Sequence, residues 1–370
     1  MEKTQPITSE LSKPITKSCQ EVISLFLTRV HAGYFRITLS LCCQSLLWKI
    51  LLHPHQNSKI TFQVPRLLYS TILTTLWSFS LTILTLLSLI YSLKCFFHFN
   101  TVKSEFKHRV GMNYLFAPWI SWLLIVESAP FVTPKHISFV ILWWVFAVPV
   151  VILDLKIYGQ WFTRGKTFLI AVANPSTQLS VVGNLVGARA AAKMEWREVS
   201  LVLFSLGMVH YLVLFVTLYQ QVSGDGDQIP EVLRPVFCLF FAVPSVASLA
   251  WYSISGRFDT AAKMLYFLSL FLFASLICRP NLFKKAMSKF NIAWWAYSYT
   301  ITMLALASVR YEQEVKGGVP RVISISLSAL SLLVLFVLII FTASNPKLLL
   351  PDHEDPVLFI SLPNIINPRL

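Results

Sequence analysis

The stretch that decides the fold is AVANPSTQLSVVGNLVGARAA, residues 171–191. As a helix it is long enough to cross the hydrocarbon of a bilayer. Its polar side chains are those of Asn174, Ser176, Thr177, Gln178, Ser180 and Asn184. Lipid cannot hydrogen-bond to such groups, so they belong against protein or water. The spacing of Gly183 and Gly187 favours close contact with a second helix. The stretch therefore predicts a membrane helix that other helices surround.

The composition of the whole chain agrees with a membrane location. The 370 residues are 55% hydrophobic and only 13% charged, about half the charged share of a typical soluble domain. This excludes an ordinary soluble enzyme and a disordered protein. The formal net charge of +14 comes from short basic runs between apolar stretches. Such a distribution favours membrane topology over nucleic-acid binding, and we expect no nucleic-acid partner.

The apolar stretches predict an all-α membrane protein with ten transmembrane helices. Because the connections are short, we expect successive helices to pair as five hairpins. The ten expected spans are 32–52, 67–93, 113–129, 136–155, 168–190, 198–220, 233–255, 260–278, 290–309 and 321–343. The domain boundaries that follow are a cytoplasmic N-terminal segment at 1–30, a transmembrane domain at 31–345 and a cytoplasmic tail at 346–370. Lys and Arg are more frequent on the set of connections that includes both termini, which predicts that both lie in the cytoplasm.

Prolines distinguish the odd-numbered spans from the even-numbered ones. Pro118, Pro175 and Pro244 fall in the third, fifth and seventh spans, whereas Pro149 is the one proline in an even span. A proline inside a helix frees a carbonyl and bends the helix, and lipid cannot satisfy that carbonyl. We therefore expect the odd helices to surround an interior path and the even helices to shield it. The alternative is that the polar residues join helices without enclosing a pore.

The chemistry of the chain fits a path for anions better than an active site. No phosphate-binding loop, GxSxG or HExxH motif occurs, so we expect no enzyme activity and no cofactor. The six cysteines form no CxxC pair, and His53 and His55 are too few to hold a metal. Neutral polar groups line the expected path, and basic residues lie near the ends of the spans, which attracts anions. These basic residues are Arg189, Lys193, Arg197 and Arg310.

Several stretches together resemble the plant slow-type (S-type) anion channels. They include HAGYFRITLSLCCQSLLWKIL at 31–51, GMNYLFAPWISWLL at 111–124 and SLGMVHYLVLFVTLYQ at 205–220, in addition to the stretch quoted first. The resemblance extends from about residue 31 to 345 and is greatest to the short homologues of the guard-cell channel. The wider family includes tellurite-resistance proteins and C4-dicarboxylate transporters.

This resemblance implies quasi-fivefold symmetry, with the five odd helices lining a central pore in each protomer. In the family a phenylalanine of the ninth helix occludes the pore and a proline follows it; Tyr299 and Thr300 stand at these two positions. Guard-cell-type members have a small glycine where this chain has Arg36, which either tunes conduction or reaches the membrane interface. The full set of expected pore and gate residues is Arg36, Pro118, Asn174, Pro175, Ser180, Pro244, Tyr299 and Thr300.

The resemblance implies an S-type anion channel subunit that passes chloride and nitrate across the plasma membrane. The alternatives are a modulatory subunit of a longer homologue and a carrier for dicarboxylates such as malate. The expected partners are membrane lipid, a regulatory kinase, and related subunits in a homotrimer or heteromer.

Overall fold

The computed structural model describes residues 24, 26–52, 66–108, 110–164, 174–223, 231–279 and 290–345. Every regular element in these ranges is a helix, which confirms the all-α class. Nearly all of the expected N-terminal segment, the expected tail from 346 onward, and His53 and His55 lie outside the described residues.

Five of the helices are buried inside the protein. These inner helices are α2 (Phe35–Leu52), α6 (Phe116–Ser128), α9 (Gln178–Lys193), α11 (Leu239–Ser255) and α14 (Trp295–Val315). In α9, the helix of the polar stretch, every residue from 178 to 191 is buried. The polar stretch is therefore surrounded by protein, as its sequence predicts.

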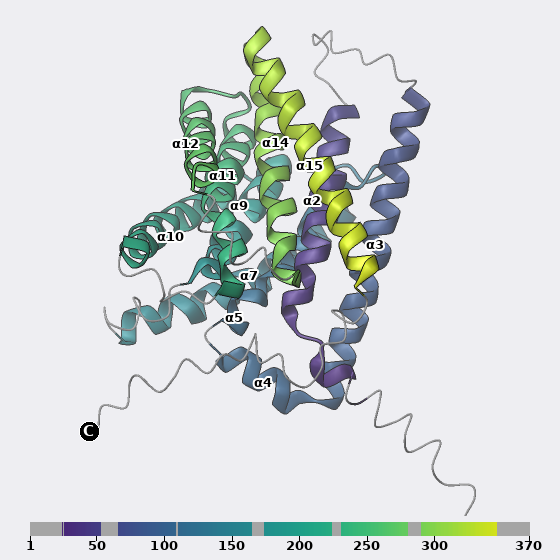
Figure 1. Cartoon of the computed structure of the whole chain (residues 1–370), viewed down its shortest axis with the longest axis vertical. Helices are drawn as coiled ribbons and strands as arrows, with labels where there is room; N and C mark the ends of the chain where they lie inside the picture. Colours follow the sequence, from purple (N-terminus) through teal and green to yellow (C-terminus); the bar gives the residue numbers. More distant parts are fainter. Residues whose placement is uncertain are drawn as a thin grey trace, which may run out of the picture.

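Five further helices form an outer layer. They are α3 (Arg66–Phe97), α7 (Ile137–Arg164), α10 (Arg197–Ser223), α12 (Thr260–Ile277) and α15 (Gly318–Ser344). Their large apolar side chains are widely exposed, as shown by Leu89 at 63%, Leu155 at 70% and Phe271 at 67%. In Figure 1, α3 lies at one edge of the molecule and α10 and α12 at the other, with α2, α11 and α14 between them. An apolar outer surface of this extent suits contact with lipid.

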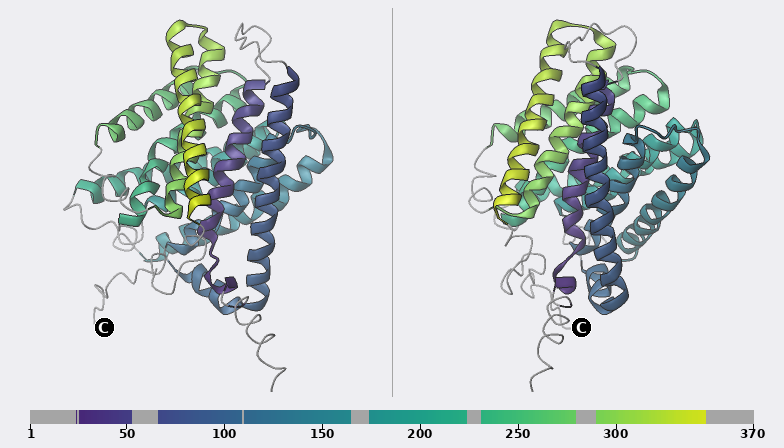
Figure 2. Two further views of the ribbon diagram at one scale, coloured as in Figure 1. Left: turned by 45° about the vertical axis from the view of Figure 1, so that its right-hand side comes forward. Right: turned by 90° about the vertical axis from the view of Figure 1, so that its right-hand side faces the viewer.

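The inner helices contact one another in a closed cycle. α2 packs against α6, α6 against α9, α9 against α11, α11 against α14, and α14 against α2 again. Each inner helix also packs against the outer helix that follows it in the chain. The left view of Figure 2 shows one such region, with α2 in purple between α3 in blue and α15 in yellow.

Short turns at the starts of the inner helices form a second closed cycle. They are η1 (Ala32–Tyr34), α5 (Gly111–Tyr114), η2 (Pro175–Thr177), η3 (Glu231–Cys238) and η4 (Ile292–Trp294). Each of them contacts the next in this order, and η4 contacts η1. The first turns of the five inner helices are therefore gathered at one end of the bundle. The helix α4 (Phe99–Lys107) joins α3 to α5.

Three of these starts have the same local structure although their sequences differ. His31, Asn174 and Asn291 precede η1, η2 and η4 with extended backbone, and the side chain of each accepts a hydrogen bond from the backbone N–H two residues later. Such a cap satisfies an N–H group that has no partner within the helix. The repeated cap is a structural repeat that the sequence letters do not display.

Seven helices in the described ranges are long and apolar enough to cross a membrane, or eight if the bent pair of α4 and α5–α6 counts as one span. The protein is therefore a multi-pass helical membrane protein. Of the ten expected spans, those at α2, α6 and α9 are outside this set of seven. α6 and α9 have only 13 and 16 residues. The count of ten remains a prediction.

Gly183 permits the close contact between α9 and its neighbours. A Cβ atom at this position would lie 2.9 Å from Cγ1 of Val150 in α7 and 3.5 Å from the ring of Phe116 in α6. The first distance is too short for carbon atoms, and the β-branched Val150 has little freedom to move away. At Gly159, also helical, a Cβ atom would meet nothing within 4 Å.

We expect Gly183→Ala to destabilise the protein by about 1–3 kcal/mol, because the added methyl group overfills the contact. Gly159→Ala is the matched control, since it gains the same helix propensity without a clash. The measurement is the melting temperature of the detergent-purified protein. Equal melting temperatures for the two variants would contradict the close packing of α9 on α7.

Candidate functional site

Arg36 is held at the end of the bundle where the inner helices start. Its Nε donates to the carbonyl of Gly33 at 2.9 Å, and its Nη1 is 3.4 Å from the hydroxyl of Tyr114. The guanidinium also lies over the Tyr114 ring, 4.6 Å from the centroid. Only 7% of the surface of Arg36 is exposed. Its charge stays among the helix starts, which themselves carry partial positive charge.

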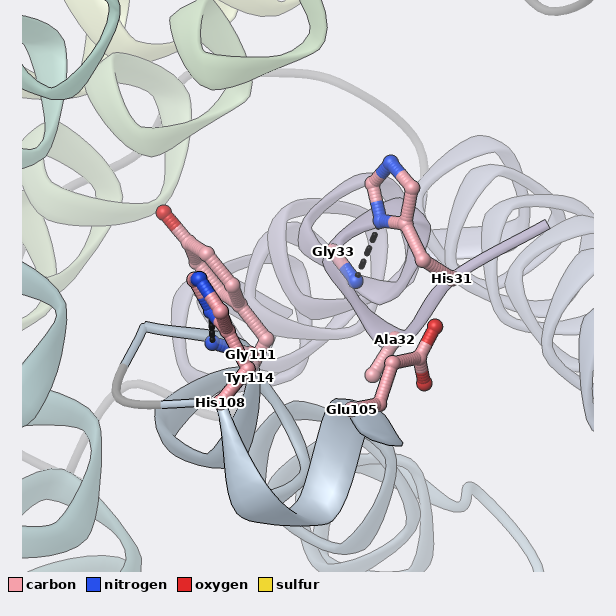
Figure 3. Close-up of a pocket in the computed structure, with 7 residues that line it drawn as sticks. All are labelled: His31, Ala32, Gly33, Glu105, His108, Gly111 and Tyr114. Carbon is pink, nitrogen blue, oxygen red and sulfur yellow. Dashed lines mark hydrogen bonds between the residues drawn. The ribbon is translucent and has the colours of Figure 1, made fainter. Parts of the chain in front are cut away.

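A small pocket lies beside this arginine, and Figure 3 shows its lining. Nδ1 of His31 accepts from the N–H of Gly33, and Nδ1 of His108 accepts from the N–H of Gly111. The carboxylate of Glu105 also has a partner, because it forms an ion pair with the ammonium of Lys94 at 2.8 Å. The volume of about 10 Å³ leaves room for roughly one water molecule. The pocket is a junction between helix starts rather than a ligand site.

The prolines lie mostly at helix starts. Pro175 is the first residue of η2, and Pro118 is the third residue of α6. In a first turn the missing N–H has no intrahelical partner to lose, so proline is tolerated without a bend. Pro244 lies inside the inner helix α11, and Pro149 lies inside the outer helix α7. Pro175 thus marks where an inner helix begins, whereas Pro118 follows the break at Leu115 between α5 and α6, inside the expected third span.

Polar side chains of the stretch 171–191 form hydrogen bonds that stabilise the start of α9. Asn174 caps η2, and Ser180 donates to the carbonyl of Thr177 at 3.0 Å. Nδ2 of Asn113 in α5 lies 3.2 Å from the hydroxyl oxygens of both Ser176 and Thr177, which joins two of the starts. These side chains satisfy one another within the ring of starts.

Tyr299 lies inside the ring of inner helices. It is 1% exposed and belongs to the hydrophobic core that the inner helices share. Within the part of the chain that the structure describes, its hydroxyl has no hydrogen-bond partner. Thr300 donates to the carbonyl of Tyr297 at 3.1 Å and lies near the thiol of Cys238. Tyr299 is therefore part of the packed core, while Thr300 lies near the start of α11.

A hydrogen-bonded triad fixes the rotation of α14 about its axis. Oε1 of Gln44 in α2 accepts from the hydroxyls of Thr302 at 3.0 Å and of Ser331 in α15 at 2.9 Å. The two hydroxyl oxygens lie 2.7 Å apart. All three residues are fully buried, and they hold the part of α14 that follows Tyr299 against α2 and α15.

A charged cluster lies at the C-terminal ends of the three inner helices α2, α6 and α9, opposite the helix starts. The sequence alone did not indicate this cluster. Glu127 of α6 lies 3.1 Å from the ammonium of Lys193 and 3.6 Å from the guanidinium of Arg189, both of α9. Lys49 of α2 donates to the carbonyls of Glu127 and Ala129. In the sequence Glu127 and Arg189 lie near span ends and far apart, so nothing there indicated that they pair.

Arg310, another of the expected mouth residues, lies 5.2 Å over the ring of Tyr252 and donates to Gln313 at 2.9 Å. Arg197 begins α10. Among the described residues, no three His, Cys, Asp or Glu side chains gather to hold a metal ion.

The arrangement defines a class of protein: a multi-pass helical membrane protein with buried inner helices, apolar outer helices and basic groups at both ends of the inner ring. The sequence matches the family described as voltage-dependent anion channel over residues 29–343. The chain belongs to this family, and within it to the S-type anion channels.

Three relatives from Arabidopsis thaliana illustrate the likeness. The S-type anion channel SLAH4 is 54% identical over 92% of this chain and 90% of its own length. The S-type anion channel SLAH1 is 51% identical over 95% and 90%. The guard cell S-type anion channel SLAC1 is 41% identical over 86% of this chain but only 56% of its own length. All three are named as channels, which favours a channel over a dicarboxylate carrier or an enzyme.

The cap at Asn174 gives a test of the helix starts. We expect Asn174→Ala to destabilise the protein by about 1 kcal/mol, because the N–H of Ser176 loses its acceptor. Asn174→Asp keeps an acceptor oxygen and is expected to retain most of the stability. Thermal unfolding in detergent measures both, and equal losses from the two substitutions would argue against a capping role.

Proposed function

We propose that this protein is an S-type anion channel subunit that lets chloride and nitrate move down their gradients across the plasma membrane. The observation that carries the proposal is the closed cycle of five buried inner helices. The buried side chains of the inner helices include neutral polar ones, such as Gln44, Ser121 and Thr302, and neutral polar groups stabilise a passing anion without holding it tightly.

The proposed conduit runs along the axis of this inner ring. Under this proposal all ten helices cross the membrane, paired as five hairpins with quasi-fivefold symmetry and both termini in the cytoplasm. α6 and α9 are short and α9 is polar, which an inner helix can be because the outer helices shield it from lipid. The five helix starts gather their partial positive charges at one end, where Arg36 adds a full charge, and this attracts anions from the cytoplasm.

Tyr299 is the proposed constriction of the conduit. Its ring is buried inside the cycle of inner helices, so the structure corresponds to a closed state in this proposal. A bulky aromatic side chain on a narrow path blocks it by volume and by excluding water. The triad of Gln44, Thr302 and Ser331 holds the helix that carries this ring.

The assembly that we propose is a homotrimer, or a heteromer with a longer homologue in which this chain modulates the current. The exposed apolar faces of the outer helices are available for lipid and for neighbouring subunits. A kinase remains the proposed regulator.

Reconstitution into planar bilayers tests the function. Purified protein is recorded in chloride and in nitrate, alone and together with a longer S-type relative. We expect anion-selective current from the homomer or an altered current from the mixture. Silence in both, from protein that remains folded, would refute the proposed function.

Replacing the tyrosine tests the constriction. We expect Tyr299→Ala to raise the current about tenfold or more, equivalent to lowering the barrier by about 1.4 kcal/mol. The matched control is Tyr266→Ala, which removes the same volume from a fully buried site on the outer helix α12. Equal currents from Tyr299→Ala and the unaltered protein would place the barrier elsewhere.

A further inference from the structure

The cluster of Lys49, Glu127, Arg189 and Lys193 has an unequal balance of charge. Arg189 and Lys193 pair with the one carboxylate, while the partly exposed Lys49 donates to the nearby carbonyls of Glu127 and Ala129, so the cluster has a formal excess of two positive charges. The side chain of Glu127 is 0% exposed and that of Arg189 is 3% exposed. Burying charge without enough counter-charge is costly. The cluster therefore favours the arrival of additional negative charge.

The contacts of Glu127 are loose in comparison with a second buried ion pair of this protein. Lys94 and Glu105 form a one-to-one pair at 2.8 Å, and the hydroxyl of Tyr91 donates to the other oxygen of Glu105 at 2.8 Å. By contrast, Glu127 has one close cationic contact, with Nζ of Lys193 at 3.1 Å, and no neutral donor among the described residues holds either of its carboxylate oxygens. Its 3.6 Å separation from Arg189 is too long for a hydrogen bond. Glu127 is therefore held mainly by charge, which leaves it replaceable by another anion.

The cluster also lies beside the proposed conduit. Arg189 is buried on the inner helix α9, which packs against α6 and α11 in the inner ring. Lys193, one helical turn further along α9, is 28% exposed and so reaches the surface. A small anion that enters from this end of the inner ring meets Lys193 first, then Arg189, before it reaches Tyr299.

We propose that Arg189 and Lys193 form a binding site for a small monovalent inorganic anion, and that the Glu127 carboxylate occupies this site as a tethered competitor. The inference rests on the proposed function, since it assigns an anion site and its regulation to the same conduit. A permeating anion displaces the carboxylate from the two cations, and the carboxylate returns when the anion leaves. The competition keeps the excess positive charge from holding the anion too tightly.

Nitrate binding to the purified protein tests the site without requiring current. The melting temperature in detergent is followed as sodium nitrate replaces sodium gluconate at constant ionic strength, because a ligand that binds the folded state raises that temperature. We expect Glu127→Gln to lower the half-saturating nitrate concentration about tenfold or more, since it removes the competing charge and keeps the side-chain shape. In Glu127→Gln combined with Arg189→Gln, the nitrate effect should disappear.

Glu195→Gln is the matched control. It removes the same charge from a carboxylate that pairs with Lys135 at 2.7 Å on the surface, two residues from Lys193. We expect the nitrate dependence of this variant to equal that of the unaltered protein. A shift as large as that of Glu127→Gln would show a general surface-charge effect and overturn the site.

Glu127→Asp covers the case in which Glu127→Gln does not fold because Arg189 loses its partner. The shorter side chain keeps its charge but withdraws from the two cations, so the half-saturating concentration should still fall severalfold. Unchanged nitrate dependence in the folded Glu127 variants would refute the tethered competitor. Nitrate binding as described, with no current in bilayers, would instead refute the conduit and leave the site standing.

Discussion

The structure depends on one constraint, which is that a helix rich in hydrogen-bonding side chains cannot face lipid. α9 meets this constraint most fully, because every residue from 178 to 191 is buried. Some of its polar side chains bond to neighbouring helices, as when Nδ2 of Asn184 donates to Asp154 of α7 at 2.6 Å, whereas the side-chain amide of Gln178 has no hydrogen-bond partner among the described residues. The outer helices then carry the apolar surface. Two layers follow from the distribution of polar residues between helices, rather than from a difference in overall hydrophobicity alone.

The sequence predicted the positions of the helices and their two layers better than it predicted how they contact each other. Each expected span contains a helix, because apolar runs are a local property that the chain displays directly. The order of contacts in the inner ring depends on packing between segments far apart in the chain. The same limit applies to Glu127 and Arg189, whose pairing brings together the ends of α6 and α9.

The repeated helix starts show a different limit of sequence reading. His31, Asn174 and Asn291 perform the same capping task with an imidazole nitrogen in one case and an amide oxygen in the others. The recurring feature is a side-chain hydrogen-bond acceptor placed two residues before the backbone N–H group that it binds. Several types of side chain can provide such an acceptor. The prolines were visible in the sequence, but Pro118 and Pro175 belong to first turns, where the physical effect of proline is the opposite of a bend.

The charged side chains at the two ends of the inner ring are held differently. This difference matters for the proposed conduction. At the helix starts, Arg36 lies on an aromatic ring and is tied to backbone oxygen, so its charge is fixed in place. At the far ends, Lys193 and Arg189 share one loosely held carboxylate. An ion path must attract its ion at the entrance and still release it at the exit. Under the proposal above, fixed charge attracts the anion at the helix starts, and the carboxylate lowers the affinity of the far cluster so that an anion does not stay bound there. Lys94 and Glu105 form a balanced buried pair, whereas the cluster at the far ends carries more positive than negative charge, and under the proposal above transient occupancy by an anion accounts for this difference.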